Sequence, residues 1–303
     1  MIPVSEQELE DYPGVTLHPK NAPWSKPVKK TVFTLNVSPD GRGNYAPEVC
    51  SLTYPLMRAY AEKIGAEFHI IKQRKFPEWP VVMEKLQIFE LGRKRGNDWN
   101  IFFDSDTLIS PEFFDVTEHL HKDTIAQNGK DMAGVRWTYD QYFRRDGRHH
   151  GACNWCAIAS DWCLDLWHPL DDLTPEQAFK NIHITINEHN SGACLREHLI
   201  DDYTLSRNIA RFGLKVKTII DICGELGWKE NGRPFNNFLY HLYAIDEKEK
   251  LRRLIGVLSA PLGAMVPHSS NPEMKPGGHP PVGVGWGLMS RDVAADLWRR
   301  WAL

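Results

Sequence analysis

The spacing of apolar positions predicts that strands and helices alternate along the first third of the chain. The expected strands are apolar and β-branched runs of strand length, at 31–38, 67–71 and 99–103. Between them, apolar residues recur every three to four positions over 45–64 and 83–91, which predicts two helices that end at Gly65 and Gly92. Strands that alternate with helices in this way predict crossover connections and a mostly parallel sheet.

The same kind of pattern continues to about residue 260. Further strands are expected at 131–137, 154–160 and 214–220, and further helices from Ser110, at 201–212 and at roughly 236–255. Between Pro261 and Gly287, twelve of 27 residues are Pro or Gly, which predicts a loop. We therefore expect an irregular leader (1–30), a single α/β domain with helices flanking the sheet (31–260) and a Pro/Gly-rich C-terminal segment that closes over the active site (261–303).

The composition is that of an ordinary folded chain. Of 303 residues, 42% are hydrophobic and 25% are charged, and the formal net charge of −3 argues against a protein that coats nucleic acid or an anionic membrane. No apolar run approaches the roughly 20 residues of a membrane-spanning helix. The first thirty residues contain acids and prolines and no apolar stretch, unlike a signal peptide. We therefore expect a cytoplasmic protein whose cysteines are reduced. Cys153-x-x-Cys156 lacks the second ligand pair of a structural zinc site, so buried structural thiols are the favoured interpretation.

Two carboxylates stand where chemistry is expected. Asp104 and Asp106 follow directly on the apolar strand 99–103, and in open α/β sheets ligands bind outside the carboxyl ends of the strands. Two carboxylates so close repel each other unless a cation lies between them, and hard oxygen ligands suit Mn²⁺ or Mg²⁺. An acidic turn after a strand is the alternative interpretation, and the context favours the metal site.

In this context the sequence resembles the GT-A glycosyltransferases, a Rossmann-related fold whose D-x-D holds a divalent metal against the diphosphate of a nucleotide sugar. The resemblance covers about residues 30–278 in the order of its parts. The segments that carry it are MRAYAEKIGAEFHII (57–71), DWNIFFDSDTLISP (98–111), CNWCAIAS (153–160), IDDYTLSRNIARFGLKV (200–216) and MVPHSSNPEMKPGG (265–278). The last segment is similar to the ending of the glycogenin-like and lipopolysaccharide galactosyltransferase families.

The resemblance implies a metal site and a phosphate contact. Asp104, Asp106 and His268 would hold the Mn²⁺ or Mg²⁺ ion, and Lys275 would close over the donor's phosphates. His241 is a rival third ligand. It lies within the helix expected at 236–255, where a lone histidine is typical of a core residue, so the prediction favours His268.

The donor is expected to be a nucleoside diphosphate sugar, with a UDP-sugar as the first choice. Asn36 and Tyr45 are placed to meet the base or ribose, and Lys85 could reach the phosphate or the donor sugar. Ser105, between the two aspartates, and Asn154, in the strand that the family places beneath the donor sugar, complete the expected donor site. A core contact for Tyr45 and a solvated helix lysine for Lys85 are the alternatives.

The acidic pair Asp201-Asp202 resembles the acidic helix of inverting members, and Asp202 is the candidate general base. The alternative is an ordinary acidic pair at a helix N-terminus, which the helix dipole stabilises. Inversion of the anomeric centre is favoured because 201–213 matches the inverting pattern at more positions than 265–278 matches the retaining one. The retaining reaction stays open.

The acceptor is unidentified, and a glycan, a protein or a modified nucleic acid is open. Arg145 and His149 lie in a basic loop that could receive an acidic acceptor, and a solvated loop is the alternative. Trp228 could stack on a sugar ring. Two other classes remain: a phosphatase of the haloacid-dehalogenase type, whose pattern puts Thr one residue later than Thr107, and a catalytically silent nucleotide-sugar-binding module on the same fold.

Overall fold

The fold is described from a computed structural model. It describes residues 27–37, 45–128, 135–137, 141–146, 155–184, 196–230, 233–234, 238–242, 247–262, 265–266 and 283–301. Among the helices within these ranges, none is long and apolar enough to cross a membrane.

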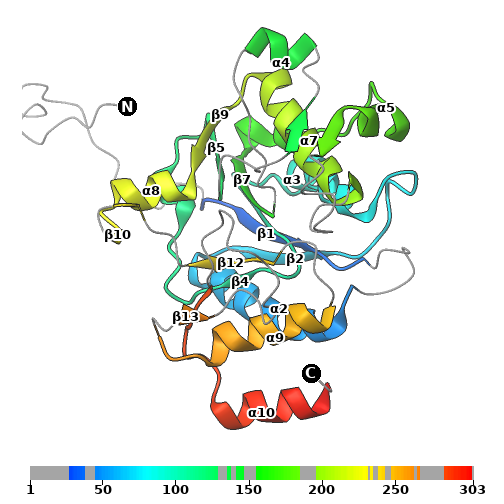
Figure 1. The fold of residues 1–303 in the computed structure, drawn as a ribbon. Coiled ribbons are helices and arrows are strands. Elements are labelled where there is room, and N and C mark those ends of the chain that lie inside the picture. Colours follow the sequence, from blue (N-terminus) through cyan, green and yellow to red (C-terminus); the bar gives the residue numbers. More distant parts are fainter. Residues whose placement is uncertain are drawn as a thin grey trace, which may run out of the picture.

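A six-stranded sheet forms the centre of the molecule (Figure 1). Its strands, in spatial order, are β2 (Glu67–Ile71), β1 (Lys30–Leu35), β3 (Trp99–Phe103), β7 (Cys156–Ser160), β5 (Thr124–Gln127) and β9 (Lys215–Thr218). Neighbours run parallel except at β7, which is antiparallel to both β3 and β5. The expected α/β class with a mostly parallel sheet is therefore confirmed.

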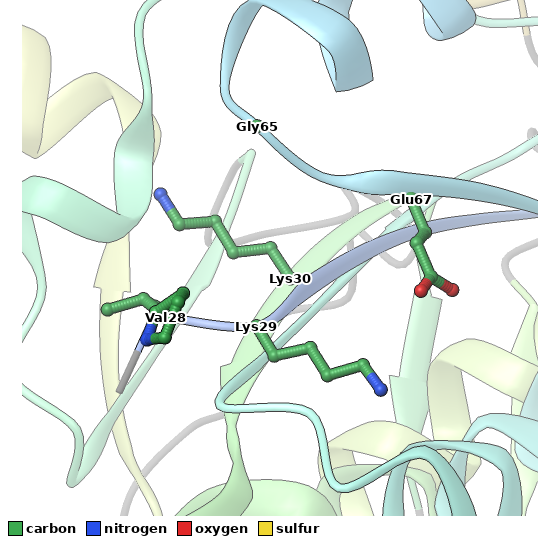
Figure 2. A pocket seen from close by; sticks show the side chains of 6 residues that line it. Val28, Lys29, Lys30, Gly65 and Glu67 are labelled. Carbon is green, nitrogen blue, oxygen red and sulfur yellow. The ribbon is translucent and has the colours of Figure 1, made fainter. Parts of the chain in front are cut away.

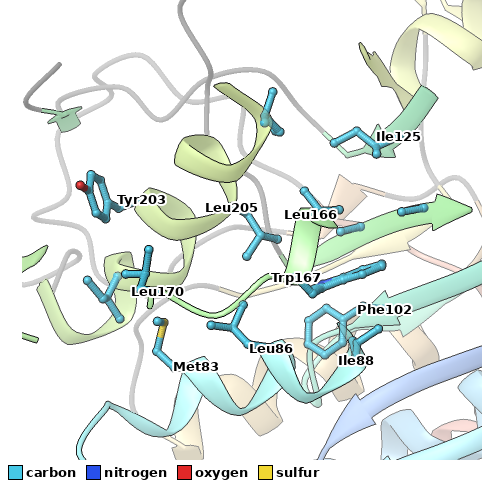
Figure 3. Packing of buried hydrophobic residues seen from close by; sticks show 14 of the residues in the cluster. Met83, Leu86, Ile88, Phe102, Ile125, Leu166, Trp167, Leu170, Tyr203 and Leu205 are labelled. Carbon is cyan, nitrogen blue, oxygen red and sulfur yellow. The ribbon is translucent and has the colours of Figure 1, made fainter. Parts of the chain in front are cut away.

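One face of the sheet is covered by an upper layer of helices (Figure 1). Its elements are η1 (Val81–Gln87), α3 (Ile88–Arg95), η3 (Asp161–Trp167) and α7 (Arg196–Phe212), with α4 (Gln141–Asp146) and α5 (Pro175–Lys180) packed on α7. Figure 3 shows Phe102 of the sheet packed with Leu86, Trp167 and Leu205 of these helices. Because alternate residues of a strand point to opposite faces, Phe102 faces this layer while its neighbours Ile101 and Phe103 face the other.

The opposite face packs against α2 (Pro47–Lys63) and α8 (Ile219–Glu225). Beyond α2, a third core joins α2 to α9 (Glu247–Ser259) and the segment before α10 (Arg291–Arg300), and its buried residues include Leu254, Val257 and Trp286. Figure 1 shows α9 and α10 stacked below the sheet. Both faces of the sheet are thus covered, which explains why its central strands are nearly continuous apolar runs.

Short paired segments complete the description. They are β4 (Leu108–Ile109) with β12 (Leu239–Tyr240), β6 (Val135–Trp137) with β8 (Ile182–Ile184), β10 (Lys229–Glu230) with β11 (Arg233–Pro234), β13 (Met265–Val266) with β14 (Gly283–Val284), and the 3₁₀-helix η2 (Val116–His119).

Several expected boundaries were wrong. The helix expected at 236–255 begins only at Glu247, because Leu239 and Tyr240 pair as a strand with β4. The helix expected from Ser110 is instead a turn followed by η2. The segment expected to be loop at 261–287 includes β13 and β14, while 267–282 lies outside the described residues.

The helix expected at 83–91 also ends later than expected. It does not stop at Gly92 but continues through α3 to Arg95, and Gly96 ends it in the left-handed conformation with φ 64°. Gly92 serves a different purpose, since a Cβ there would lie 2.5 Å from Asn100 Oδ1. The glycine therefore allows α3 to approach β3 closely.

Candidate active site

The two aspartates leave β3 in a tight turn at its carboxyl end. The Asp104 N–H donates to Trp155 O at 2.8 Å, and the Thr107 N–H donates back to Asp104 O at 3.0 Å. The intervening Ser105 is fixed from two sides: its hydroxyl donates to Leu35 O, and its own carbonyl accepts from Thr53 Oγ1 at 2.5 Å. The turn is thereby held against the carboxyl end of β1, the neighbouring strand.

His241 follows β12 and faces both aspartates. Its Nε2 atom lies 3.1 Å from Asp106 Oδ1 and 3.8 Å from Asp104 Oδ2. The imidazole stacks on Trp155, with ring centroids 4.9 Å apart and planes 8° from parallel. One ligand atom from each of Asp104, Asp106 and His241 lies within 4.8 Å of the other two, so the three side chains could hold a metal ion.

Two lysines supply the positive charge beside these carboxylates. Lys85 is completely buried, and its ammonium donates to Asp104 Oδ1 at 3.1 Å and to Asp201 Oδ2. Lys250, from α9, donates to Asp106 Oδ2 and, at 3.0 Å, to the Tyr45 hydroxyl. Both ammonium groups are held by the carboxylates, because a buried charge without a partner is costly.

The two aspartates therefore differ electrostatically. Burial raises the pKa of Asp104 above its usual range, and Lys85 and His241 only partly offset that rise. Burial also acts to raise the pKa of Asp106, but His241 and Lys250 outweigh it and hold the pKa of that carboxyl well below its usual range. Asp106 is thus firmly ionised at neutral pH, which is the state that a metal ligand requires.

The lysines and Tyr45 respond to the same charges. Burial alone would lower the pKa of each lysine, but Asp104 and Asp201 raise the pKa of Lys85, and Asp106 raises that of Lys250. Burial, together with the charge of Asp106, raises the pKa of Tyr45 to about 12. The phenol therefore stays protonated at neutral pH.

The structure brings Asn36 and Tyr45 to this site. The Tyr45 N–H donates to Asn36 Oδ1 at 2.9 Å, and the Tyr45 hydroxyl reaches Asp106 through Lys250. Together with Ser105, the two expected donor residues therefore lie around the carboxyl ends of β1 and β3.

Asp201 and Asp202 are buried in the second turn of α7, which begins at Arg196 rather than at Asp201 as expected. They are therefore not the acidic pair of a helix N-terminus, and the helix dipole does not explain them. Asp201 reaches the D-x-D turn through Lys85, and Asp202 is close enough to raise the pKa of the same lysine.

For the other expected site residues, the structure shows contacts outside the cluster around Asp104 or gives no description. Arg145 donates to Arg211 O at 2.7 Å, and Arg211 is ten residues after Asp201, about 15 Å along a helix axis. Trp228 packs on Phe114 and Phe238, with ring centroids 4.7 Å and 4.8 Å away. Four further residues lie outside the described part of the chain: His149, Asn154, His268 and Lys275.

Sequence reasoning missed Lys250, although a signal was present. Leu254 and Val257, four and seven residues further along α9, are buried, so Lys250 occupies the apolar stripe of the helix. A lysine in such a stripe indicates a buried acidic partner. The contact between Trp155 and His241 had no comparable signal, because it joins residues distant in sequence.

A pocket elsewhere on the molecule has a different character. Figure 2 shows that it is lined by Lys29, Lys30, Gly65 and Glu67, at the amino ends of β1 and β2. Ligands of open α/β sheets bind at the carboxyl ends of the strands. The cluster around Asp104 is therefore the candidate active site, and this pocket is not.

Comparison with known proteins gives structural likeness only. No family model matches the sequence, and no curated protein sequence matches it. The chain is similar to a glycosyltransferase involved in the glycosylation of the major capsid of PBCV-1, with 10% identity, 74% of this chain and 98% of that chain covered, and a TM-score of 0.42. It is also similar to a protein from STIV (12% identity, 72% and 87% covered, TM-score 0.33). A third similar structure is the inositol-1-phosphate CTP transferase from T. maritima (9% identity, 63% and 85% covered, TM-score 0.29). At TM-scores this low, the likenesses carry no argument about activity.

Proposed function

We propose that this protein is a metal-dependent glycosyltransferase of the GT-A type, which transfers a sugar from a nucleoside diphosphate sugar to an acceptor. The observation that carries the proposal is the convergence of Asp104, Asp106 and His241 at the carboxyl end of a central strand. Sheets of this class bind their ligands at that edge. Two carboxylate oxygens and an imidazole nitrogen suit Mn²⁺, and carboxylates alone suit Mg²⁺.

The chemistry follows from the charge of the leaving group. When bound, the ion would neutralise the diphosphate that departs as the glycosidic bond breaks. The proposed ligands are Asp104 and Asp106 with either His241 or His268, and the position of His241 beside both carboxylates supports the former.

The residues around the turn would bind the donor, with a UDP-sugar as the first choice. Asn36, Tyr45 and Ser105 are the proposed contacts for base and ribose, because they lie together where β1 and β3 end. Lys85, Asn154 and Lys275 are the proposed contacts for the donor sugar and phosphates.

Asp202 is the proposed general base. The resemblance of 201–213 to the acidic helix of inverting members supports Asp202 as the group that takes the acceptor's proton. Asp202 also lies close enough to Lys85 to raise the pKa of that lysine. A base that acts in this way implies inversion at the anomeric carbon.

Arg145, His149 and Trp228 are kept as proposed acceptor contacts, and the acceptor class stays open. We place the reaction in the cytoplasm, a proposal that the free thiols of Cys50, Cys156, Cys163 and Cys223 support.

The test is a panel of nucleotide sugars incubated with the full chain and Mn²⁺, followed by detection of the released nucleoside diphosphate. Hydrolysis of a donor should occur, should stop with EDTA and should return with Mn²⁺ or Mg²⁺. Asp106→Ala should reduce it by several orders of magnitude, because the ion supplies several kcal/mol of charge stabilisation. Full activity in EDTA would refute the proposal. Release of phosphate from a generic ester would indicate a phosphatase, and donor binding without turnover would indicate a silent binding module.

The third ligand is tested separately. His241→Ala should weaken Mn²⁺ binding in direct titration, while His268→Ala should leave it near the wild-type value. The reverse result would identify His268 as the ligand.

A further inference from the structure

Lys250 occupies a position on α9 where the helical pattern favours an apolar residue. The neighbouring positions of the same helical stripe, Leu254 and Val257, are completely buried in the third core. Burial of an ammonium group there is costly unless the charge is paired. Among the described residues, the partners of Lys250 are Asp106 and the Tyr45 hydroxyl. The ion pair with Asp106 therefore compensates the burial of the Lys250 ammonium.

This pairing conflicts with the metal site. The ammonium of Lys250 holds Asp106 Oδ2, while Asp106 Oδ1 faces His241 Nε2 at 3.1 Å, on the side where the ion is proposed to bind. Two cations on one buried carboxylate repel each other strongly, because the surrounding protein screens them less than water does. In the donor-free site Lys250 therefore competes electrostatically with the metal.

Lys85 differs from Lys250 in this respect. Its ammonium is shared between Asp104 and Asp201, so it keeps a carboxylate partner even when Asp104 turns to an ion. Of its partners in the described part of the chain, Lys250 would keep only the neutral Tyr45 hydroxyl, whose raised pKa leaves it protonated. Lys250 is consequently the cation in need of a new anionic partner once an ion occupies Asp106.

We propose that Lys250 is an internal counter-cation that weakens metal binding in the donor-free site and is then taken up by the donor's diphosphate. The diphosphate oxygens accept from the ammonium that the metal displaces, so metal and nucleoside diphosphate bind cooperatively. The inference rests on the proposed function for the identity of the anion. Linkage requires that each ligand tighten the other by the same factor.

The experiment measures Mn²⁺ binding to the full chain by the electron paramagnetic resonance signal of free Mn²⁺, with and without UDP. In the wild type, UDP should tighten Mn²⁺ binding about tenfold or more. Lys250→Met should tighten Mn²⁺ binding without UDP by about tenfold, and should lose most of the further gain from UDP. Arg252→Met, which removes the same charge from an exposed position of the same helix, should change neither value.

For a second variant, Lys250→Arg, we expect the opposite change in Mn²⁺ affinity. Lys250→Arg keeps the charge, and its guanidinium can engage both oxygens of Asp106, so Mn²⁺ binding without UDP should weaken. This measurement decides the matter even when Lys250→Met fails to fold. Unchanged or weaker Mn²⁺ binding in Lys250→Met, or tighter binding in Lys250→Arg, would overturn the inference. Failure of UDP to bind the wild type would instead refute the donor class, while the UDP-free comparison would still test the competition.

Discussion

At the scale of single residues, Asp106 is held at both of its carboxylate oxygens. It is buried between His241, which follows a short strand, and Lys250, on a helix far along the chain. Removing one partner of such a buried ionic cluster leaves the others uncompensated, which typically costs about 3–5 kcal/mol. The cluster therefore sets the geometry of the ligands as well as their charge.

The lowered pKa of Asp106 predicts a pH dependence of stability. The pKa of the folded state lies below that of the unfolded chain, so the contribution of the ionised carboxylate is complete above the unfolded value, about 4, and is lost as the pH falls further. In urea denaturation with EDTA, the difference in unfolding free energy between wild type and Asp106→Asn should be constant from neutral pH to about pH 5 and shrink below about pH 4.

The control for this measurement is Glu78→Gln, at an exposed turn position outside the helices, which should show no such change. A difference between wild type and Asp106→Asn that grows as the pH falls would contradict the assigned direction of the pKa shift.

The second residue-scale prediction concerns Asp202. Asp202→Asn preserves the shape of the side chain but removes the proton acceptor, so turnover should fall by about 10²–10⁴. Binding of the donor, measured by titration, should survive because Asp202 is proposed to face the acceptor. The early product, observed by nuclear magnetic resonance, should have the opposite anomeric configuration to the donor. A retained configuration would remove the role of base from Asp202, even if the variant were inactive.

At the scale of elements, close packing of α3 on β3 depends on Gly92. Alanine is the better helix former by about 1 kcal/mol, but its Cβ would lie 2.5 Å from Asn100 Oδ1 and 3.0 Å from Leu164 Cδ1. Overpacking of this kind typically costs about 1–3 kcal/mol. Gly92→Ala should therefore lower the free energy of unfolding in urea, whereas Arg93→Ala, exposed on the same helix, should change it little. A stabilised Gly92→Ala would show that propensity outweighs packing here.

The elements also show which parts of the fold the sequence could predict. The strands β2 and β3 were predicted to the residue, and the ends of the strand β1 and the helix α2 to within three residues, because their apolar patterns are regular. The strand β5 was not predicted, since Ile125 and Ala126 are its only apolar residues and its stability comes from pairing with β7 and β9.

The candidate site divides in the same way. Asp104 and Asp106 could be predicted because they directly follow a recognisable strand. The position of His241 could not, because it depends on the pairing of β12 with β4, which joins segments about 130 residues apart. The burial of Lys250 could have been predicted, because Lys250 lies in line with Leu254 and Val257 on the apolar stripe of α9.

At the scale of the whole molecule, the site lies where the cores meet. Lys85 and Asp201 come from the helices above the sheet, and Lys250 comes from α9 below it (Figure 1). The position of Lys250 therefore depends on the third core, which includes Trp286 and is closed by backbone hydrogen bonds such as Met289 N–H to Leu258 O at 2.9 Å. A chain that ended at residue 260, the expected end of the α/β domain, would lack Trp286 and Met289 and so part of that support.

The last prediction tests this dependence. A Pro/Gly-rich segment alone would suggest that truncation after Ala260 leaves the fold intact. However, the Trp286 side chain is buried, with the residue only 6% exposed, and the backbone N–H of Trp286 donates to Val257 O at 2.8 Å. Trp286→Ala should therefore cost about 3–5 kcal/mol in urea denaturation, and the truncation should cost at least as much. Trp298→Ala, whose side chain is 48% exposed, should stay close to the wild type. Because α9 carries Lys250, the destabilised Trp286→Ala protein should also show altered Mn²⁺ binding. A truncated chain with wild-type stability and Mn²⁺ affinity would show that the C-terminal segment supports neither α9 nor the site.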